Sequence, residues 1–300
     1  MALESFGEVF ALVCALMWAT AVVLFKYVGE SMSANTLNFV KNILGLLMLV
    51  LTAVVVEGFA LPSLTYTEWG ILIASGYFGI ALADTWYLQA LRNLGAGRTA
   101  IVASLYSPFV VMLSIVFLGE TLARWQWLGF AMVLAGILVV VYQRNHQEID
   151  QKVFMSGVVL AACSVFLTAA GVVAMKPILE NDGFFWMVGL RMLAGVIGML
   201  IFLVVKGRLT PTLVEVRDGD HRWKLIIFAS IAGSYLSLLF WLGGFKYADA
   251  SVASVLNETA NIFIVLMAWL FLRESLSKRK IVGVVLTFSG VLVFLGLLGS

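Results

Sequence analysis

The chain has 300 residues, of which 62% are hydrophobic and 12% are charged, and its formal net charge is +2. Soluble domains contain roughly half apolar and a quarter charged residues, so this composition excludes an ordinary soluble fold. The near-neutral charge gives no indication of nucleic-acid binding. The composition predicts an all-α membrane protein, because a stretch of about 20 apolar residues can cross a bilayer as a helix.

Ten such stretches follow one another along the chain, five in each half. We expect transmembrane helices near residues 7–25, 34–56, 69–90, 97–118, 124–142, 153–175, 184–205, 224–246, 250–272 and 279–298. The sequence therefore predicts a first five-helix repeat over residues 1–143, a connecting cytoplasmic loop over 144–152 and a second five-helix repeat over 153–300.

The two halves resemble each other in charged and small residues as well as in hydropathy. Glu120 and Glu274 lie 154 residues apart, whereas Lys41 and Arg191 lie 150 residues apart. Because five is an odd number, the second copy would enter the bilayer from the side opposite to the first. Inverted repeats are typical of alternating-access transporters, whose binding site lies near the midplane of the membrane.

Basic residues gather in the loops after the first, third, fifth, seventh and ninth spans. The loop between spans 4 and 5 has one basic residue and its counterpart between spans 9 and 10 has four. Positively charged loops stay in the cytoplasm. We therefore expect these odd-numbered loops to be cytoplasmic and both termini to be external.

Four charged residues lie well inside the predicted spans, namely Lys41, Asp84, Arg191 and Glu258. An ionisable group in the hydrocarbon region costs about 3 kcal/mol, so each needs a partner or a wet cavity. They could form salt bridges that only lock helices together, or they could line a transport pathway. Lys41 and Arg191 are expected at mirrored depths, where each could serve as a gate or extend to the head groups.

Glu258 is the main candidate for the ionisable group of a central site, with Asp84 as its secondary partner. It lies between Ser254 and Asn261 on one predicted helix face and could exchange a proton or bind the ammonium of a substrate. The other candidate site residues flank these charges: Asn38 and Asn42 beside the Lys41 gate, Asn257 beside Glu258, and Trp18, Tyr77, Tyr87, Ser104, Tyr235 and Trp241 along the pathway. Pro108 is expected to kink the fourth span.

The sequence predicts neither a metal site nor a cofactor. Cys14 and Cys163 lie in separate spans without a CxxC spacing, and His146 and His221 lie in polar loops. No Walker A motif is present, so direct use of ATP is not expected.

Several short motifs occur in a fixed order. LGETL at Leu118–Leu122 and LRESL at Leu272–Leu276 each precede a Gly-containing apolar span, and YLQAL at Tyr87–Leu91 precedes Ser107–Pro108. Together with the basic residue early in spans 2 and 7, this order resembles a duplicated EamA domain of the drug/metabolite transporter superfamily. The resemblance implies ten helices in an inverted arrangement, a central cavity among helices 1, 3, 4, 6, 8 and 9, and export of amino-acid-like or drug-like solutes. In the second copy Asn261–Ile262 replaces Ser107–Pro108, which leaves the symmetry of the kink open.

These observations predict a secondary active transporter, not an enzyme, in the plasma membrane, with a bacterial inner membrane as the expected location. Its expected partners are a small-molecule substrate, the lipid bilayer and a proton or another coupling ion, and we expect a monomer. Two alternatives are an intramembrane enzyme with Asp84 and Glu258 as a carboxylate pair, and a non-transporting sensor or scaffold.

Overall fold

The computed structural model describes residues 2–28, 31–141, 150–179, 183–294 and 296, and these residues contain helices but no strands. Eight helical segments are long and apolar enough to cross a membrane: Phe6–Val28, Ala34–Glu57, Tyr66–Leu94, Ala96–Leu118, Gln151–Leu179, Phe184–Val205, Trp223–Tyr247 and Ala250–Leu272. They match eight of the ten predicted spans. Most of the predicted connecting loop at 144–152 lies outside the described residues.

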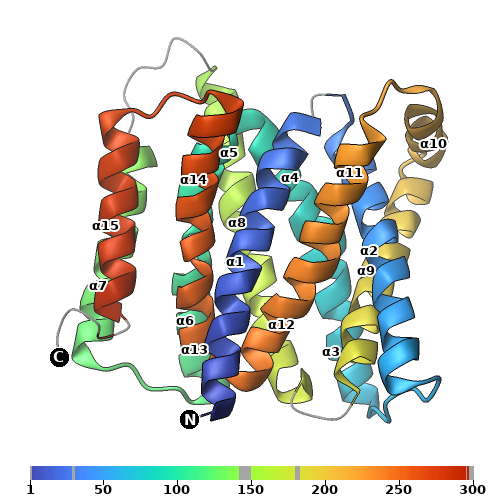
Figure 1. Cartoon of the computed structure of the whole chain (residues 1–300), viewed down its shortest axis with the longest axis horizontal. Helices are drawn as coiled ribbons and strands as arrows, with labels where there is room; N and C mark the ends of the chain where they lie inside the picture. Colours follow the sequence, from blue (N-terminus) through green and yellow to red (C-terminus); the bar gives the residue numbers. More distant parts are fainter. Residues whose placement is uncertain (1, 29–30, 142–149, 180–182, 295, 297–300) are drawn as a thin grey trace.

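The fifth and tenth predicted spans correspond to α7 (Arg124–Val141) and α15 (Lys278–Phe294). These two helices pack mainly against each other and stand at one side of the molecule (Figure 1). Both are helical as expected, but neither is among the eight segments that meet the length and hydropathy required of a span within the described residues.

Apart from the additional helix α10 in the second half, the elements of the two halves follow the same order, which confirms that the chain is duplicated. In the first half, α7 is preceded by α1 (Ala2–Val28), α2 (Ala34–Glu57), α3 (Tyr66–Gly76), the π-helix η1 (Tyr77–Leu82), α4 (Ala83–Leu94), α5 (Ala96–Ala103) and α6 (Tyr106–Leu118). The second comprises α8 (Gln151–Leu179), α9 (Phe184–Val205), α10 (Leu209–Asp218), α11 (Trp223–Ser230), the π-helix η2 (Ile231–Ser237), α12 (Leu238–Tyr247), α13 (Ala250–Asn257) and α14 (Thr259–Leu272).

Local irregularities of the backbone also recur at the repeat spacing. The two π-helices begin at Tyr77 and Ile231, and the left-handed residues that end α6 and α14 are Gly119 and Arg273. Each pair lies 154 residues apart. Arg273 keeps the left-handed conformation, with φ 54°, although glycine adopts it at lower cost. The backbone shape is therefore shared by both copies even where the side chains differ.

The two halves interlock. The first helix of each half packs mainly on the other half, α1 on α12 and α14, and α8 on α4 and α6. The second helices cross in the same way, because α2 approaches η2 at Gly45 and α9 approaches η1 at Gly195. A Cβ atom on Gly45 would lie 2.7 Å from Ser234 Cβ, and one on Gly195 would lie 2.6 Å from Ile80 Cβ. The two residues that these glycines approach, Ser234 and Ile80, both line the cavity between the halves.

The paired segments Ala96–Leu118 and Ala250–Leu272 run in opposite directions. Figure 1 shows α5 beside α14 towards one end of the molecule and α6 beside α13 towards the other end, in agreement with the contacts between these helices. The N-terminus of α1 and the end of α15 lie at the same end of the molecule (Figure 1).

Among the described residues, four glutamates each cap the N-terminus of a helix in the other half. Glu274 accepts hydrogen bonds from the backbone N–H groups of Ala96 at 2.6 Å and Gly97 at 3.1 Å, at the start of α5. Its repeat counterpart Glu120 accepts from the N–H of Ala250 at 3.3 Å, at the start of α13. A carboxylate at a helix N-terminus satisfies free N–H groups and complements the helix dipole. The LxE motifs of the sequence therefore carry reciprocal caps between the two halves.

The other two capping glutamates act on the second helices of the halves. Glu57 of the first half accepts from the N–H groups of Phe185 at 3.1 Å and Trp186 at 3.0 Å, in the first turn of α9. Glu215 of the second half accepts hydrogen bonds from Ser33 and Thr36 at the start of α2. Burial raises the pKa of Glu215, but these hydrogen bonds outweigh burial and leave the pKa below its ordinary value. The helix α10, which carries Glu215, lies between the predicted spans 184–205 and 224–246, where the sequence predicts no helix.

Candidate functional site

A cavity of about 170 Å³ lies between the two halves. This is more than ten times the ~10–15 Å³ that one water requires. Its polar and aromatic lining includes Cys14, Trp18, Lys41, Asn42, Asp84, Tyr87, Tyr106, Ser164, Thr168, Arg191, Ser234, Ser237, Trp241, Asn257, Glu258 and Asn261. All four charged residues predicted inside the spans therefore line one cavity.

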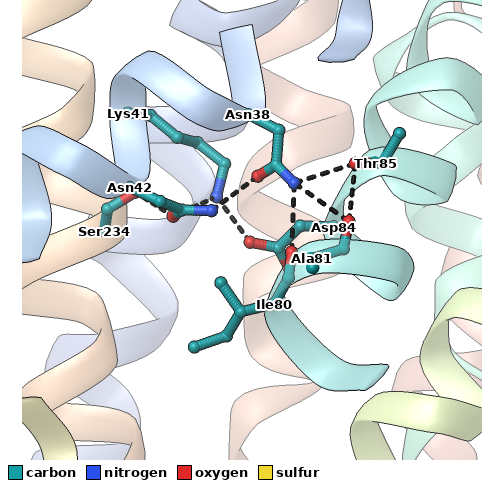
Figure 2. Close-up of polar contacts among 8 residues, drawn as sticks. All are labelled: Asn38, Lys41, Asn42, Ile80, Ala81, Asp84, Thr85 and Ser234. Atoms are coloured by element: carbon teal, nitrogen blue, oxygen red, sulfur yellow. Dashed lines mark hydrogen bonds and ion pairs between the residues drawn. The ribbon is translucent and has the colours of Figure 1, made fainter. Parts of the chain in front are cut away.

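Lys41 is neutralised within the first half. Its side chain is 3% exposed, and Nζ lies 2.5 Å from Asp84 Oδ2 and 3.0 Å from Asn42 Oδ1 (Figure 2). Asn42 donates to Asn38 Oδ1 at 2.7 Å and accepts a hydrogen bond from the Ser234 hydroxyl at 3.3 Å. Lys41 therefore does not extend to the head groups. Asp84, which we expected as the partner of Glu258, is instead the counter-ion of Lys41.

Asn38 supports this ion pair from the π-helix side. Its Nδ2 donates to the carbonyl of Ile80 at 3.0 Å, to that of Ala81 at 3.4 Å and to Thr85 Oγ1 at 2.9 Å (Figure 2). A π-helical turn changes the spacing of main-chain hydrogen bonds and is frequent at functional sites. Asn38 thus supplies donors to the irregular turn of η1 that precedes Asp84.

Arg191 is held in place but keeps an unpartnered N–H group. Its side chain is 1% exposed, Nε donates to Ser75 Oγ at 2.8 Å, and the guanidinium carbon lies 5.2 Å from the centre of the Trp241 ring. Ser75 in turn donates to the carbonyl of Gly171 at 3.1 Å. In the described part of the chain, Nη1 has no hydrogen-bond partner and no acidic side chain lies within ion-pair distance of the guanidinium.

Glu258 is bound by neutral donors only. Its side chain is 3% exposed, Oε1 accepts from the Ser107 N–H at 3.0 Å, and Oε2 accepts from Asn261 Nδ2 at 2.6 Å. Asn261 Nδ2 also donates to Ser104 Oγ at 3.0 Å. No basic side chain of the described residues forms an ion pair with Glu258. Asp84 and Glu258 therefore belong to separate hydrogen-bond networks and do not form a carboxylate pair.

Breaks in two helices create the environment of Glu258. α5 ends before Ser104 and α6 begins at Tyr106, while α13 ends before Glu258 and α14 begins at Thr259. The first break fits Pro108, whose ring excludes the carbonyl four residues earlier. The second has no proline, so the kink is present in both copies despite the difference in sequence. The continuous polar face predicted for the ninth span is instead interrupted at Glu258 itself.

The structure brings most of the predicted substrate-binding and gating residues to the cavity, and five remain outside its lining. Ser104 and Ser254 are buried beside it, the former bonded to Asn261 and the latter 3.5 Å from the Ser107 hydroxyl. Tyr235 bonds Thr52 through its hydroxyl at 2.7 Å, and Tyr77 is 37% exposed. Asn38, assigned to a gate, bonds Asn42 and the backbone of η1 and does not line the cavity. The proposed gating residues Lys41, Asn42 and Arg191 all line the same cavity.

Sequence reasoning missed Tyr106, Cys14 and Leu238, which also line the cavity. The hydroxyl of Tyr106 accepts a hydrogen bond from Trp241 Nε1 at 3.0 Å, beside the helix break. Its position two residues before Pro108 was a usable signal, since residues at a helix break often face a cavity.

Three buried polar groups of the lining have no partner among the described residues. They are Nη1 of Arg191, both atoms of the Asn257 amide and the Tyr87 hydroxyl. Buried polar groups are normally satisfied by protein or by water. Their convergence on one cavity indicates a site for a polar solute or for water. The described residues include no group of three or more His, Cys, Asp or Glu side chains that could hold a metal.

Comparison with known proteins agrees with this architecture. Residues 5–142 and 155–296 each match the EamA-like transporter family. The chain belongs to this family. It is a multi-pass transmembrane transporter built from two EamA domains.

The chain is also similar to several proteins that are named transporters. The chain is 24% identical to the uncharacterized transporter YdfC of Bacillus subtilis, covering 92% of this chain and 86% of that protein. It is 25% identical to the uncharacterized inner membrane transporter YhbE of Escherichia coli over 46% of this chain and 42% of that protein. It is 22% identical to the dog UDP-N-acetylglucosamine transporter over 68% and 63% of the two chains. A solved crystal structure matches with a TM-score of 0.72 at 18% identity over 99% of each chain, which supports the fold.

The buried ion pair predicts a non-additive effect on stability. Lys41→Met should lower the free energy of unfolding by roughly 3 kcal/mol, because Asp84 then lacks its counter-ion in a region of low polarity. Lys41→Met combined with Asp84→Leu should recover most of that loss. Thermal unfolding of the detergent-purified variants measures both effects. A double variant less stable than Lys41→Met would contradict the assignment of Asp84 as the counter-ion.

Proposed function

We propose that this chain is a secondary active transporter that moves a small amino-acid-like metabolite across the plasma membrane by alternating access. The observation that carries this proposal is the cavity between the halves, into which a buried cation and a buried anion project without mutual pairing. Intramembrane charges are costly and usually mark a transport pathway. Export is the direction that the family resemblance implies.

The arrangement of the halves supports an inverted repeat of ten helices. The segments Ala96–Leu118 and Ala250–Leu272, which correspond in the two copies, run antiparallel beside the cavity (Figure 1). The termini of α1 and α15 lie at one end of the molecule, as an even number of crossings requires. Two antiparallel copies around one site can exchange their conformations and so open the site to alternate sides.

Glu258 is the candidate coupling residue. Its carboxylate is buried, faces the cavity and is held by Ser107 and Asn261 without a basic partner among the described residues. Such a group can exchange a proton with the cavity or receive the ammonium group of a substrate. Both roles are compatible with transport driven by an ion gradient or by exchange. A neutral residue in place of Glu258 would remove proton coupling in the first case and substrate binding in the second.

Glu258→Gln keeps the shape of the side chain and removes its charge. If Glu258 carries protons, the variant should lose gradient-driven accumulation in proteoliposomes and retain exchange across the membrane. If Glu258 binds an ammonium group, accumulation and exchange should both fall at least about tenfold, as expected for loss of a charged hydrogen bond. Uptake of radiolabelled amino acids with and without a pH gradient distinguishes the two results.

Asp218→Asn is the matched control, because Asp218 is an exposed acid that pairs with Arg217 outside the cavity. It should transport like the unmodified protein. Wild-type accumulation and unchanged pH dependence in Glu258→Gln would remove Glu258 from the mechanism and leave it a structural residue.

The charge bias between loops supports external termini, and the name of the relative YhbE supports a bacterial inner membrane as the location. A reporter fused to the C-terminus should therefore behave as external, and a cysteine replacing Arg279 should react only from the cytoplasm. Cytoplasmic activity of the reporter would reverse the orientation without affecting the fold.

A further inference from the structure

The two halves treat their intramembrane cations differently. Lys41 and Arg191 occupy corresponding positions 150 residues apart, and both are buried at the cavity. Lys41 has Asp84 as its counter-ion at 2.5 Å. Arg191 has no acidic partner in the described part of the chain, and its Nη1 is unbonded. One cation of the cavity therefore has a direct ion pair, and the other has none among the described residues.

The repeat shows what is missing beside Arg191. The position that corresponds to Asp84 in the second half, 154 residues later, is Leu238. Leu238 begins α12 directly after η2, as Asp84 lies in the first turn of α4 after η1, and it lines the same cavity. The second half thus retains the cation and the backbone shape of the first half but has an apolar residue in place of the counter-ion.

The guanidinium of Arg191 is already oriented for a ligand. Ser75 fixes Nε, the Trp241 ring lies against the guanidinium plane, and Gly79 leaves room for Nη2, which lies 2.8 Å from the place where a Cβ on that glycine would be. These contacts leave N–H groups at the far end of the side chain for a ligand in the cavity. A planar guanidinium matches a carboxylate, which accepts two parallel hydrogen bonds from it.

We propose that the solute carried by this transporter brings a carboxylate that binds Arg191, taking beside Leu238 the place that Asp84 takes beside Lys41. This inference rests on the proposed function and names the chemical class of the substrate. The cavity favours a single carboxylate over a phosphate or another multiply charged anion, because Glu258 lines the same space and repels additional negative charge. The unpartnered amide of Asn257 offers a further donor and acceptor to the rest of the solute.

Ligand-induced stabilisation of the purified protein tests the chemistry directly, since a ligand that binds the folded state raises its unfolding temperature. The probes are L-amino acids and simple monocarboxylic acids, each compared with its methyl ester at equal concentration, together with inorganic phosphate and sulfate. Acids should stabilise the protein, whereas their esters and the two inorganic anions should not. Arg191→Gln should raise the Kd of the effective acids by roughly 10- to 150-fold, the equivalent of one hydrogen bond to a charged group.

A pair of variants at Leu238 tests the geometry. Leu238→Asp supplies the missing counter-ion from within the chain and should abolish stabilisation by acids. Leu238→Asn has nearly the same shape as Leu238→Asp without the charge, and it should weaken stabilisation by acids much less than Leu238→Asp does. A much larger loss of acid binding in Leu238→Asp than in Leu238→Asn would identify the added charge, not the change in side-chain volume, as the cause of the loss. Equal binding of acids in Leu238→Asp and the unmodified protein would overturn the proposal, and so would esters that stabilise as strongly as acids.

Transport measurements separate this inference from the proposed function. Acid binding that depends on Arg191, without solute movement in proteoliposomes, would support the carboxylate site while refuting transport. Transport of amines or esters at the same rate in Arg191→Gln as in the unmodified protein would support transport while refuting the carboxylate site. The carboxylate site would also be refuted if none of the acids raised the unfolding temperature of a protein sample that unfolds cooperatively and is therefore folded.

Discussion

The structure depends on one constraint, which is the cost of placing charge inside a bilayer. Each buried ionisable group needs a counter-ion, hydrogen-bond partners or a hydrated cavity. Lys41 meets this requirement through Asp84, and the supporting hydrogen bonds of Asn38 and Asn42 hold the second and third spans together. Arg191 and Glu258 are only partly satisfied by neutral side chains and the backbone. The cavity lies beside these two residues, for which the described protein supplies no counter-ion.

The two halves share their backbone features but differ in the charged side chains that they contribute to the cavity. The backbone features recur, including the π-helices, the breaks at Ser104 and Glu258, and the reciprocal caps by Glu120 and Glu274. The negative charges of the cavity do not recur, because Asp84 corresponds to Leu238 and Glu258 corresponds to Ser104. Shared helix breaks and close helix contacts maintain the frame, so single polar substitutions on it can change the chemistry of the cavity without changing the fold.

The sequence predicted the positions of the spans, the duplication and the residues with intramembrane charge, because each of these is a local or periodic property of the chain. It did not predict which charges pair. Lys41 and Asp84 meet because η1 changes the rotation of the third span and Asn38 bonds its irregular turn, and no one-dimensional pattern encodes that rotation. The break at Glu258 lacks a proline, so the sequence left open whether the second copy is kinked. The helix α10 was read as a loop because its capping role depends on Ser33 and Thr36, which are distant in sequence.

Alternating access requires that the cavity open to each side of the membrane in turn. Ser237 lines the cavity and is 3% exposed, and the chain has two cysteines, Cys14 and Cys163, that can be replaced by serine. A cysteine at Ser237 in that background can be treated with a membrane-impermeant methanethiosulfonate reagent from either side of oriented vesicles. Alternating access predicts modification from both sides. Modification from one side alone, with and without amino acids present, would contradict it.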